Sequence, residues 1–390
     1  MKKALLSIVA VGVIAWVGLW GFSRMKENQS ASKAWPGNLG PLDAAAQRFP
    51  AAEQSPGATK LVQLAAAADI DMAQRTRETA VKPSDDPKVS ASRTVLGEYL
   101  KAQFERSGDA IDAPPPAAAQ YLAQHDAALS AVRDHLLSGA PIVWETKLRE
   151  GFNAPIPNLV GQMHLHRAFA ARALDKARQN DPGAWNELRA SWELNRGLWK
   201  RPDLLSILIA LATTRMDAAA ARKMPLPVPE WFREEQAFDP LAAMAASQQA
   251  ESWTIHHTMP GKRTLRDLLS APFYAFQGAD AIEVMRNYTA EALRSNACDA
   301  DSAQFATARA SLMTQNAAVP NLIQAWHRAM RYRAESEATE RILQMRAGQR
   351  LTVSSRCSDG SWQLTPNGMK FSRDIKVAPQ GINFPLEYVR

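Results

Sequence analysis

The hydrophobic pattern of the chain opens with one long apolar run. Residues 4–22 contain no charged side chain, and two lysines precede them. A helix rises about 1.5 Å per residue, so a run of this length just crosses the roughly 30 Å hydrocarbon core of a bilayer. The pattern therefore predicts a transmembrane helix within a membrane anchor at residues 1–26.

The same run has a second interpretation, a secretory signal peptide that is removed. Signal peptides have a shorter apolar stretch of about 7–15 residues, followed by a small-residue cleavage site. Here the nearest such site, Ala-Ser-Lys-Ala at 31–34, lies beyond Phe22. Trp20 and Phe22 stand near the outer end of the run, where aromatic rings favour the membrane interface. We expect the run to stay attached, in a bacterial inner membrane, with the N-terminus inside and the body in the periplasm or outside.

Beyond a polar linker at 27–56, apolar residues recur at helical spacing. The predicted helices are 58–75, 92–106, 117–138, 158–180, 182–200, 203–223, 240–257, 263–272, 279–295, 301–316 and 320–346. The helix 203–223 starts with Leu and Ile on almost every face, which is typical of a helix inside a core. We expect its neighbours 158–180 and 182–200 to pack around it in a helical body at 57–348.

After Gly348 the pattern changes to short runs that favour strands. They lie at 351–355, 362–364, 369–372, 375–377 and 382–384. The pairs Asp359-Gly360 and Asn367-Gly368 suit the tight turns of hairpins. The fold class is therefore mainly α: a transmembrane helix, a multi-helix body (irregular array or bundle) and a small antiparallel β cap at 349–390.

Composition limits the partners more than it identifies them. The formal net charge of +7 is a mild excess for 390 residues. No basic run is interleaved with aromatic residues, as nucleic-acid binding would need. We expect contact with a membrane through residues 4–22, a possible envelope protein partner and no nucleic acid.

The chain has two cysteines, Cys298 and Cys357. An even, minimal count outside the cytosol predicts one disulfide bond. Cys298 lies just before a predicted helix and Cys357 lies in the β-like tail, so the bond would tie the cap to the body. The alternative is two unrelated thiols.

Linear motifs of catalysis and ligand binding are missing. The sequence has no His-Glu-x-x-His, no Cys-x-x-Cys, no Gly-x-Ser-x-Gly and no phosphate-binding or dinucleotide glycine loop. His166 stands in the apolar stripe of 158–180, where a hydrogen-bonded core residue is expected. Asp299-Ala300-Asp301 begins like a calcium loop but lacks its third acid and its glycine, so helix capping explains it better. We predict no catalytic residue, no metal and no cofactor, and the sequence identifies no small-molecule ligand.

Residues 185–192 resemble the first half of a tetratricopeptide repeat. Trp185, Leu188 and Trp192 have the repeat's aromatic and leucine spacing. Arg189 stands where the repeat has a small residue, and no 34-residue period recurs. Helices that stack on one another give the same pattern through packing alone, and either interpretation predicts a helical array with this tryptophan stripe in its core.

These patterns favour a non-enzymatic scaffold or protein-binding component of a bacterial envelope. The alternative is an envelope hydrolase whose catalytic residues follow no linear motif. A pocket with converging polar groups and perturbed titrating residues would favour the hydrolase. An exposed apolar helical face would favour the binding protein.

Overall fold

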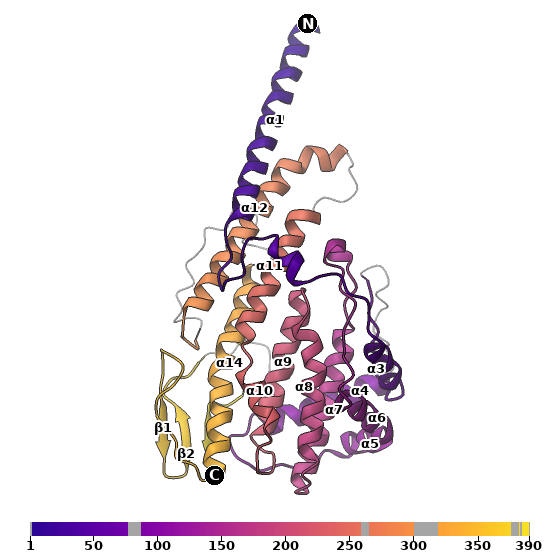
Figure 1. The fold of residues 1–390 in the computed structure, drawn as a ribbon, viewed down its shortest axis with the longest axis vertical. Helices are drawn as coiled ribbons and strands as arrows, with labels where there is room; N and C mark the ends of the chain where they lie inside the picture. Colours follow the sequence, from indigo (N-terminus) through magenta and orange to yellow (C-terminus); the bar gives the residue numbers. More distant parts are fainter. Residues whose placement is uncertain are drawn as a thin grey trace.

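Helices make up most of the computed structural model, with a small three-stranded antiparallel sheet near the C-terminus, as the pattern predicts. The structure describes residues 2–76, 87–258, 265–299, 319–375, 382 and 384–389. Its helices are α1 (Lys2–Ser32), α2 (Ala44–Arg48), α3 (Pro56–Ala66), α4 (Pro87–Phe104), α5 (Pro116–Gln124), α6 (Asp126–Leu137), the 3₁₀ helix η1 (Leu148–Asn153), α7 (Leu159–Arg178), α8 (Ala184–Trp199), α9 (Leu204–Ala221), α10 (Trp231–Ala237), α11 (Pro240–Thr258), α12 (Leu265–Arg294) and α14 (Val319–Arg346). In Figure 1, α1 projects from one end of the helical body and the C-terminus lies at the other end.

Side-chain caps mark the starts of several helices. Ser55, Asn158 and Asp203 each accept a hydrogen bond from a backbone N–H in the first turn of α3, α7 and α9. Such a bond satisfies one of the backbone donors that a helix start leaves unpaired. These short polar residues therefore fix where the central helices begin.

The predicted core helix is α9, which packs against α7, α8, α11 and α14. Among the residues whose side chains the structure describes, which in α1 begin only at residue 14, α9 is the one helix long and apolar enough to cross a membrane, and 72% of it is buried inside the body. Two details differ from the prediction of a helix that is apolar all round. Leu205 is 57% exposed, and the second half of α9 buries polar residues, including Arg215 and Asp217.

The predicted tryptophan stripe lies in the core as expected. Trp185, Trp192 and Trp199 on α8 are all buried. They contact aromatic residues in and next to α10, a short helix that the pattern did not indicate. The indole N–H of Trp185 donates to the carbonyl of Pro225 at 2.7 Å.

Several boundaries differ from the predicted ones. The predicted helix 117–138 is two helices that meet at His125, and 58–75 ends as a helix at Ala66. The segments 263–272 and 279–295 form one helix, α12, with Pro272 inside it. In Figure 1, α12 is bent, which a proline within a helix explains. The predicted helix 301–316 lies outside the described residues.

The segment predicted as a linker, 27–56, packs against the body instead. α1 continues to Ser32, and Trp35, Leu42 and Ala45 are buried in a cluster with Trp253 of α11. The segment is mostly polar in sequence, but its few apolar residues are enough to pack it against the helical body.

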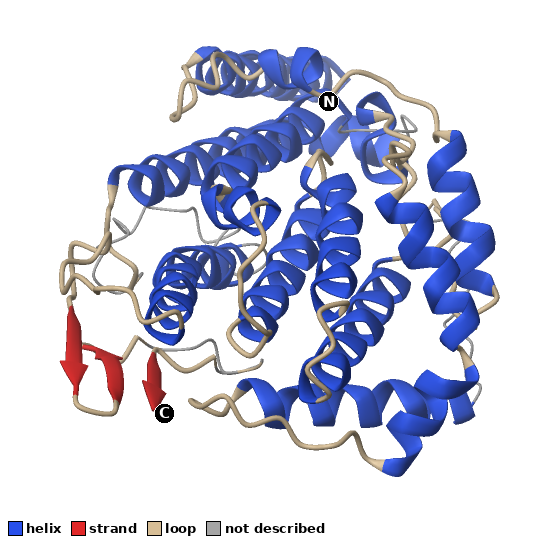
Figure 2. Cartoon of the chain, turned by 60° about the horizontal axis from the view of Figure 1, so that its bottom comes forward, coloured by secondary structure: helices blue, strands red, loops and turns tan. Residues whose placement is uncertain are grey.

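The strands are β1 (Trp362–Thr365), β2 (Gly368–Phe371) and β3 (Glu387–Val389), in the order β1-β2-β3. The first two were predicted, and Trp362 pairs with Phe371 across them. The third strand lies at Glu387–Val389, and 351–355 is a loop; of the predicted run 382–384, the described residues 382 and 384 are outside a strand. Part of 375–377 lies outside the described residues. Figure 2 shows the sheet at one edge of the helical array. Its buried side chains join α14 in a separate apolar cluster.

Candidate functional site

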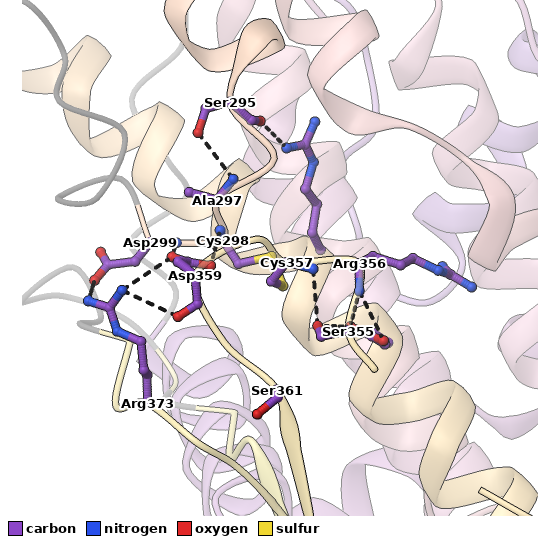
Figure 3. The surroundings of a disulfide bond; sticks show 12 residues. Ser295, Ala297, Cys298, Asp299, Ser355, Arg356, Cys357, Asp359, Ser361 and Arg373 are labelled. Carbon is purple, nitrogen blue, oxygen red and sulfur yellow. Dashed lines mark hydrogen bonds and ion pairs between the residues drawn. A yellow bond between two sulfur atoms is a disulfide. The ribbon is translucent and has the colours of Figure 1, made fainter. Parts of the chain in front are cut away.

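The two cysteines predicted to pair lie at the junction of α12, α14 and the β cap. The sulfur atoms of Cys298 and Cys357 are 2.00 Å apart, at disulfide distance, and both residues are buried. Figure 3 shows Asp359 beside this pair: its carboxylate oxygens accept from the backbone N–H groups of Cys298 and Asp299, each at 3.0 Å. Arg373 completes the cluster, 3.4 Å from Asp299. The positions of the two sulfur atoms therefore fit the predicted disulfide bond between the β cap and the helical body.

The same three residues, Cys298, Cys357 and Asp359, form the one group within the described chain whose ligand atoms lie close enough to share a metal ion. A paired disulfide offers no thiolate to a cation, since the thiolate is the metal-binding form of cysteine. Both oxygens of Asp359 already accept backbone hydrogen bonds. The prediction of no metal remains a prediction, and this cluster gives no reason to change it.

A cluster with catalytic residue types lies in the core, where three helices meet. His166 of α7, Ser191 of α8 and Asp217 of α9 are all fully buried. The Ser191 hydroxyl lies 2.8 and 2.9 Å from the two oxygens of Asp217 and donates to this carboxylate, and His166 Nδ1 is 2.6 Å from the same hydroxyl. A catalytic triad places its histidine between the acid and the serine. Here the serine stands in the middle, so the histidine is not oriented by the acid.

Burial controls the titration of this cluster. It lowers the pKa of His166 to about 3 and raises the pKa of Asp217 well above its usual range, although the bond from Ser191 opposes the second effect. Glu235 of α10 is also buried, and burial, followed by the neighbouring Asp217, raises its pKa. Neutral forms are thus favoured at each position. With no exposed surface, this arrangement has the properties of a polar core and not of an open active site.

A second buried polar cluster joins α9 to α14. The carboxylate of Glu335 accepts from Arg215 at 2.6 and 2.7 Å and from Arg331 at 2.8 Å. Arg331 also donates to the carbonyl of Phe384, and Arg222 donates to that of Pro385. These bonds connect the central helices with the C-terminal segment, so the cluster is structural.

A mainly apolar cavity of about 400 Å³ lies between η1, the start of α9, α11 and α12. That volume falls within the range of roughly 300–1,000 Å³ typical of small-molecule pockets. Its apolar lining includes Leu148, Phe152, Leu204, Leu208 and Met285. No sequence pattern predicts this cavity, because its wall is assembled from four separate elements.

No protein-family model, curated protein or solved structure matches the chain. The structure defines a mainly helical protein with a small antiparallel sheet.

Neither buried cluster was predicted from the sequence. The partners of Asp217 and Arg215 lie 26 and 120 residues away, so no local spacing connects them. The available signal was the presence of an arginine and an aspartate within an apolar helix. A buried polar or charged side chain needs a hydrogen-bond partner, and each of these residues has one.

Proposed function

We propose that the chain is a single-pass membrane protein of a bacterial envelope, whose body serves as a non-enzymatic scaffold or binding component on the periplasmic or outer side. The observation that carries this proposal is the contrast between the two halves of α1. Apolar side chains described between residues 14 and 22 are largely exposed, whereas the half that follows packs against the body.

The first half supports a membrane anchor. From residue 14 onward, where the structure describes its side chains, Ile14 is 71%, Val17 51% and Phe22 48% exposed. Figure 1 shows this half standing clear of the body. A continuous exposed apolar surface marks a site of membrane or protein contact, and the length of residues 4–22 suits a bilayer.

The second half of α1 forms a polar seam with α11 and α12. Ser23, Glu27 and Ser30 are buried on one face. Glu27 lies 3.2 Å from His256 of α11, and Arg286 of α12 donates to the carbonyl of Ser30 at 2.8 Å. These contacts support a stiff connection that would hold the body at a fixed orientation to the membrane.

Aromatic residues lie at the expected membrane surface. The rings of Phe22 on α1 and Phe276 on α12 are 6.0 Å apart. On the same part of α12, Phe273 is 54% and Tyr274 39% exposed. Aromatic rings are enriched at membrane interfaces, so this part of α12 supports a body seated against the bilayer.

The hydrolase alternative rests on the cluster of His166, Ser191 and Asp217. Its complete burial and its order of hydrogen bonds favour the non-enzymatic reading. Ser191→Ala separates the two, because a scaffold should keep its cellular phenotype with this change. Loss of the phenotype at a normal protein level and with a normal fold would favour the hydrolase.

Crosslinking of the full chain in its native membrane tests the scaffold itself. A photoreactive amino acid at the exposed Val160 of α7 should capture one reproducible envelope protein, and partner identification by mass spectrometry completes the assay. A matched probe at Leu364, exposed on β1 in the cap, tests whether capture is confined to one face. Random capture at both positions would contradict a specific binding surface.

A further inference from the structure

The cavity beside η1 contains one buried polar side chain that is not fully hydrogen-bonded. Gln248 of α11 lines the cavity and is 0% exposed. Its Oε1 lies 2.7 Å from the hydroxyl of Thr289, whereas its Nε2 has no hydrogen-bond partner among the described residues. A buried donor without a partner is unfavourable. A ligand oxygen in the cavity would satisfy it once the Gln248 side chain turns toward the cavity.

The charged side chains of the lining are already paired. Arg201 binds Asp203 at 2.9 Å and the carbonyl of Pro155 at 2.8 Å. Lys147 lies 2.5 Å from Glu145. Because both cations are neutralised by the protein, the lining favours a neutral oxygen acceptor over a phosphate or another strong anion.

The acid of the lining supports the same conclusion. Glu251 accepts from the backbone N–H of Leu204 at 3.1 Å. Burial raises the pKa of Glu251, with a further contribution from Asp203, although the bond from Leu204 opposes both. A less ionised carboxyl makes the site more suitable for an apolar molecule.

The position of the cavity indicates where such a molecule would come from. Met285 lines it, and the next residue, Arg286, donates to the carbonyl of Ser30. Ser30 lies eight residues beyond Phe22, about 12 Å along a helix. The polar region of a bilayer is roughly 5–8 Å thick on each side, so the cavity begins just beneath it. Leu205, in the wall, is 57% exposed.

We propose that this cavity binds a lipid acyl chain with a carbonyl oxygen at its head: the chain lies against Leu204, Leu208 and Met285, and the carbonyl accepts from Gln248. The proposal deepens the binding role and rests on the proposed membrane anchor for the source of the ligand. The carbonyl can belong to a fatty acid in its protonated form or to a lipid ester, since both offer a neutral carbonyl acceptor.

The test uses the full chain in phosphatidylcholine nanodiscs with two photoreactive probes, a diazirine oleic acid and a diazirine lysophosphatidylcholine. After irradiation, mass spectrometry maps the labelled peptides. Label at 148–156 and 204–208 is expected with at least one probe. The acid alone would indicate a free fatty acid as ligand, and the lysolipid alone a membrane ester. Label confined to residues 4–22 would overturn the proposal.

Variants make the result specific to the cavity. Leu205→Trp should narrow its opening and lower the label at 204–208 at least fivefold, whereas Leu364→Trp, an equally large change at an exposed site of β1, should leave it unchanged. Gln248→Leu should lower labelling by the oleic acid probe about threefold to tenfold and leave labelling by a diazirine alkane unchanged. Equal labelling of all three variants and the wild type would contradict the assignment.

If the proposed membrane anchor is wrong, the experiment gives a different result from the one expected if only the lipid site is wrong. A chain that does not enter the nanodiscs would contradict the proposed function. The oleic acid probe added without a bilayer would then still decide whether 204–208 binds an acyl chain.

Discussion

Replacement of Glu335 by glutamine should destabilise the protein more than any single change to a surface ion pair. The Glu335 carboxylate is 1% exposed and accepts three hydrogen bonds from Arg215 and Arg331, which are themselves buried. The Glu335→Gln variant keeps the size of the side chain and one acceptor oxygen. It removes the negative charge that neutralises the two guanidinium groups.

The magnitude follows from burial. Breaking a buried ion pair from one side costs about 3–5 kcal/mol, because the remaining charge stays in a poorly solvated site. The remaining oxygen of glutamine places the expected loss near the lower end, about 3 kcal/mol. The matched control is Glu193→Gln. Glu193 pairs with Arg196 at 2.9 Å on the same face of a helix, but Arg196 is 51% exposed, so the expected loss is about 0.5 kcal/mol or less.

Urea unfolding of the full chain in detergent, followed by circular dichroism, measures both losses. A pH series adds an internal check. Burial alone raises the pKa of Glu335, but the two guanidinium groups outweigh it and the pKa is lowered. The stabilisation is therefore present above about pH 4.3, the usual value for glutamate, and is lost as the pH falls through the lowered pKa. The difference between wild type and Glu335→Gln should shrink on acidification. Equal losses for both variants at neutral pH would refute a buried pair between α9 and α14.

Three further predictions concern the cap, the core and the polar cluster. Reduction of the Cys298–Cys357 pair should loosen the β cap before the helices, with a loss of up to about 4 kcal/mol for a loop of this length; two freely alkylated thiols in the untreated, denatured chain would show that no bond forms. Leu211→Ala on α9, where the side chain is buried, should cost about 2–5 kcal/mol in urea unfolding, and a loss no greater than that of Leu205→Ala would contradict the packing. Asp217→Asn should flatten the pH dependence of stability, because the raised pKa of Asp217 gives a contribution that is present below about pH 3.9 and is lost as the pH rises through the raised value; an unchanged profile between pH 4 and pH 9 would contradict this.

The helical architecture could be predicted because its causes are local. Apolar spacing located α7, α8 and α9 to within a few residues, and prolines or short polar residues marked their starts. The hairpin of β1 and β2 followed from a turn sequence between alternating residues. Boundaries were less accurate where tertiary contacts extend an element, as in α1, or where a proline bends a helix without ending it, as in α12.

The candidate site could not be predicted in the same way. The cavity needs η1, α9, α11 and α12 to be assembled, and Gln248 looks in the sequence like any glutamine on an alanine-rich helix. The buried cluster around Asp217 depends on three helices. Leu208 illustrates the limit: it belongs to the helix 203–223, which the pattern placed in the core, whereas the structure shows its side chain half-buried in the cavity wall.

The state of residues 4–22 in the mature protein tests the central claim most directly. The full chain is expressed in bacterial cells and extracted from their carbonate-washed membranes, and its intact mass and N-terminal sequence are determined. A mature chain that retains residues 4–22 and stays in the washed membranes is the predicted result. A soluble chain that begins near Lys33 or Ala34 would contradict the membrane-anchored account.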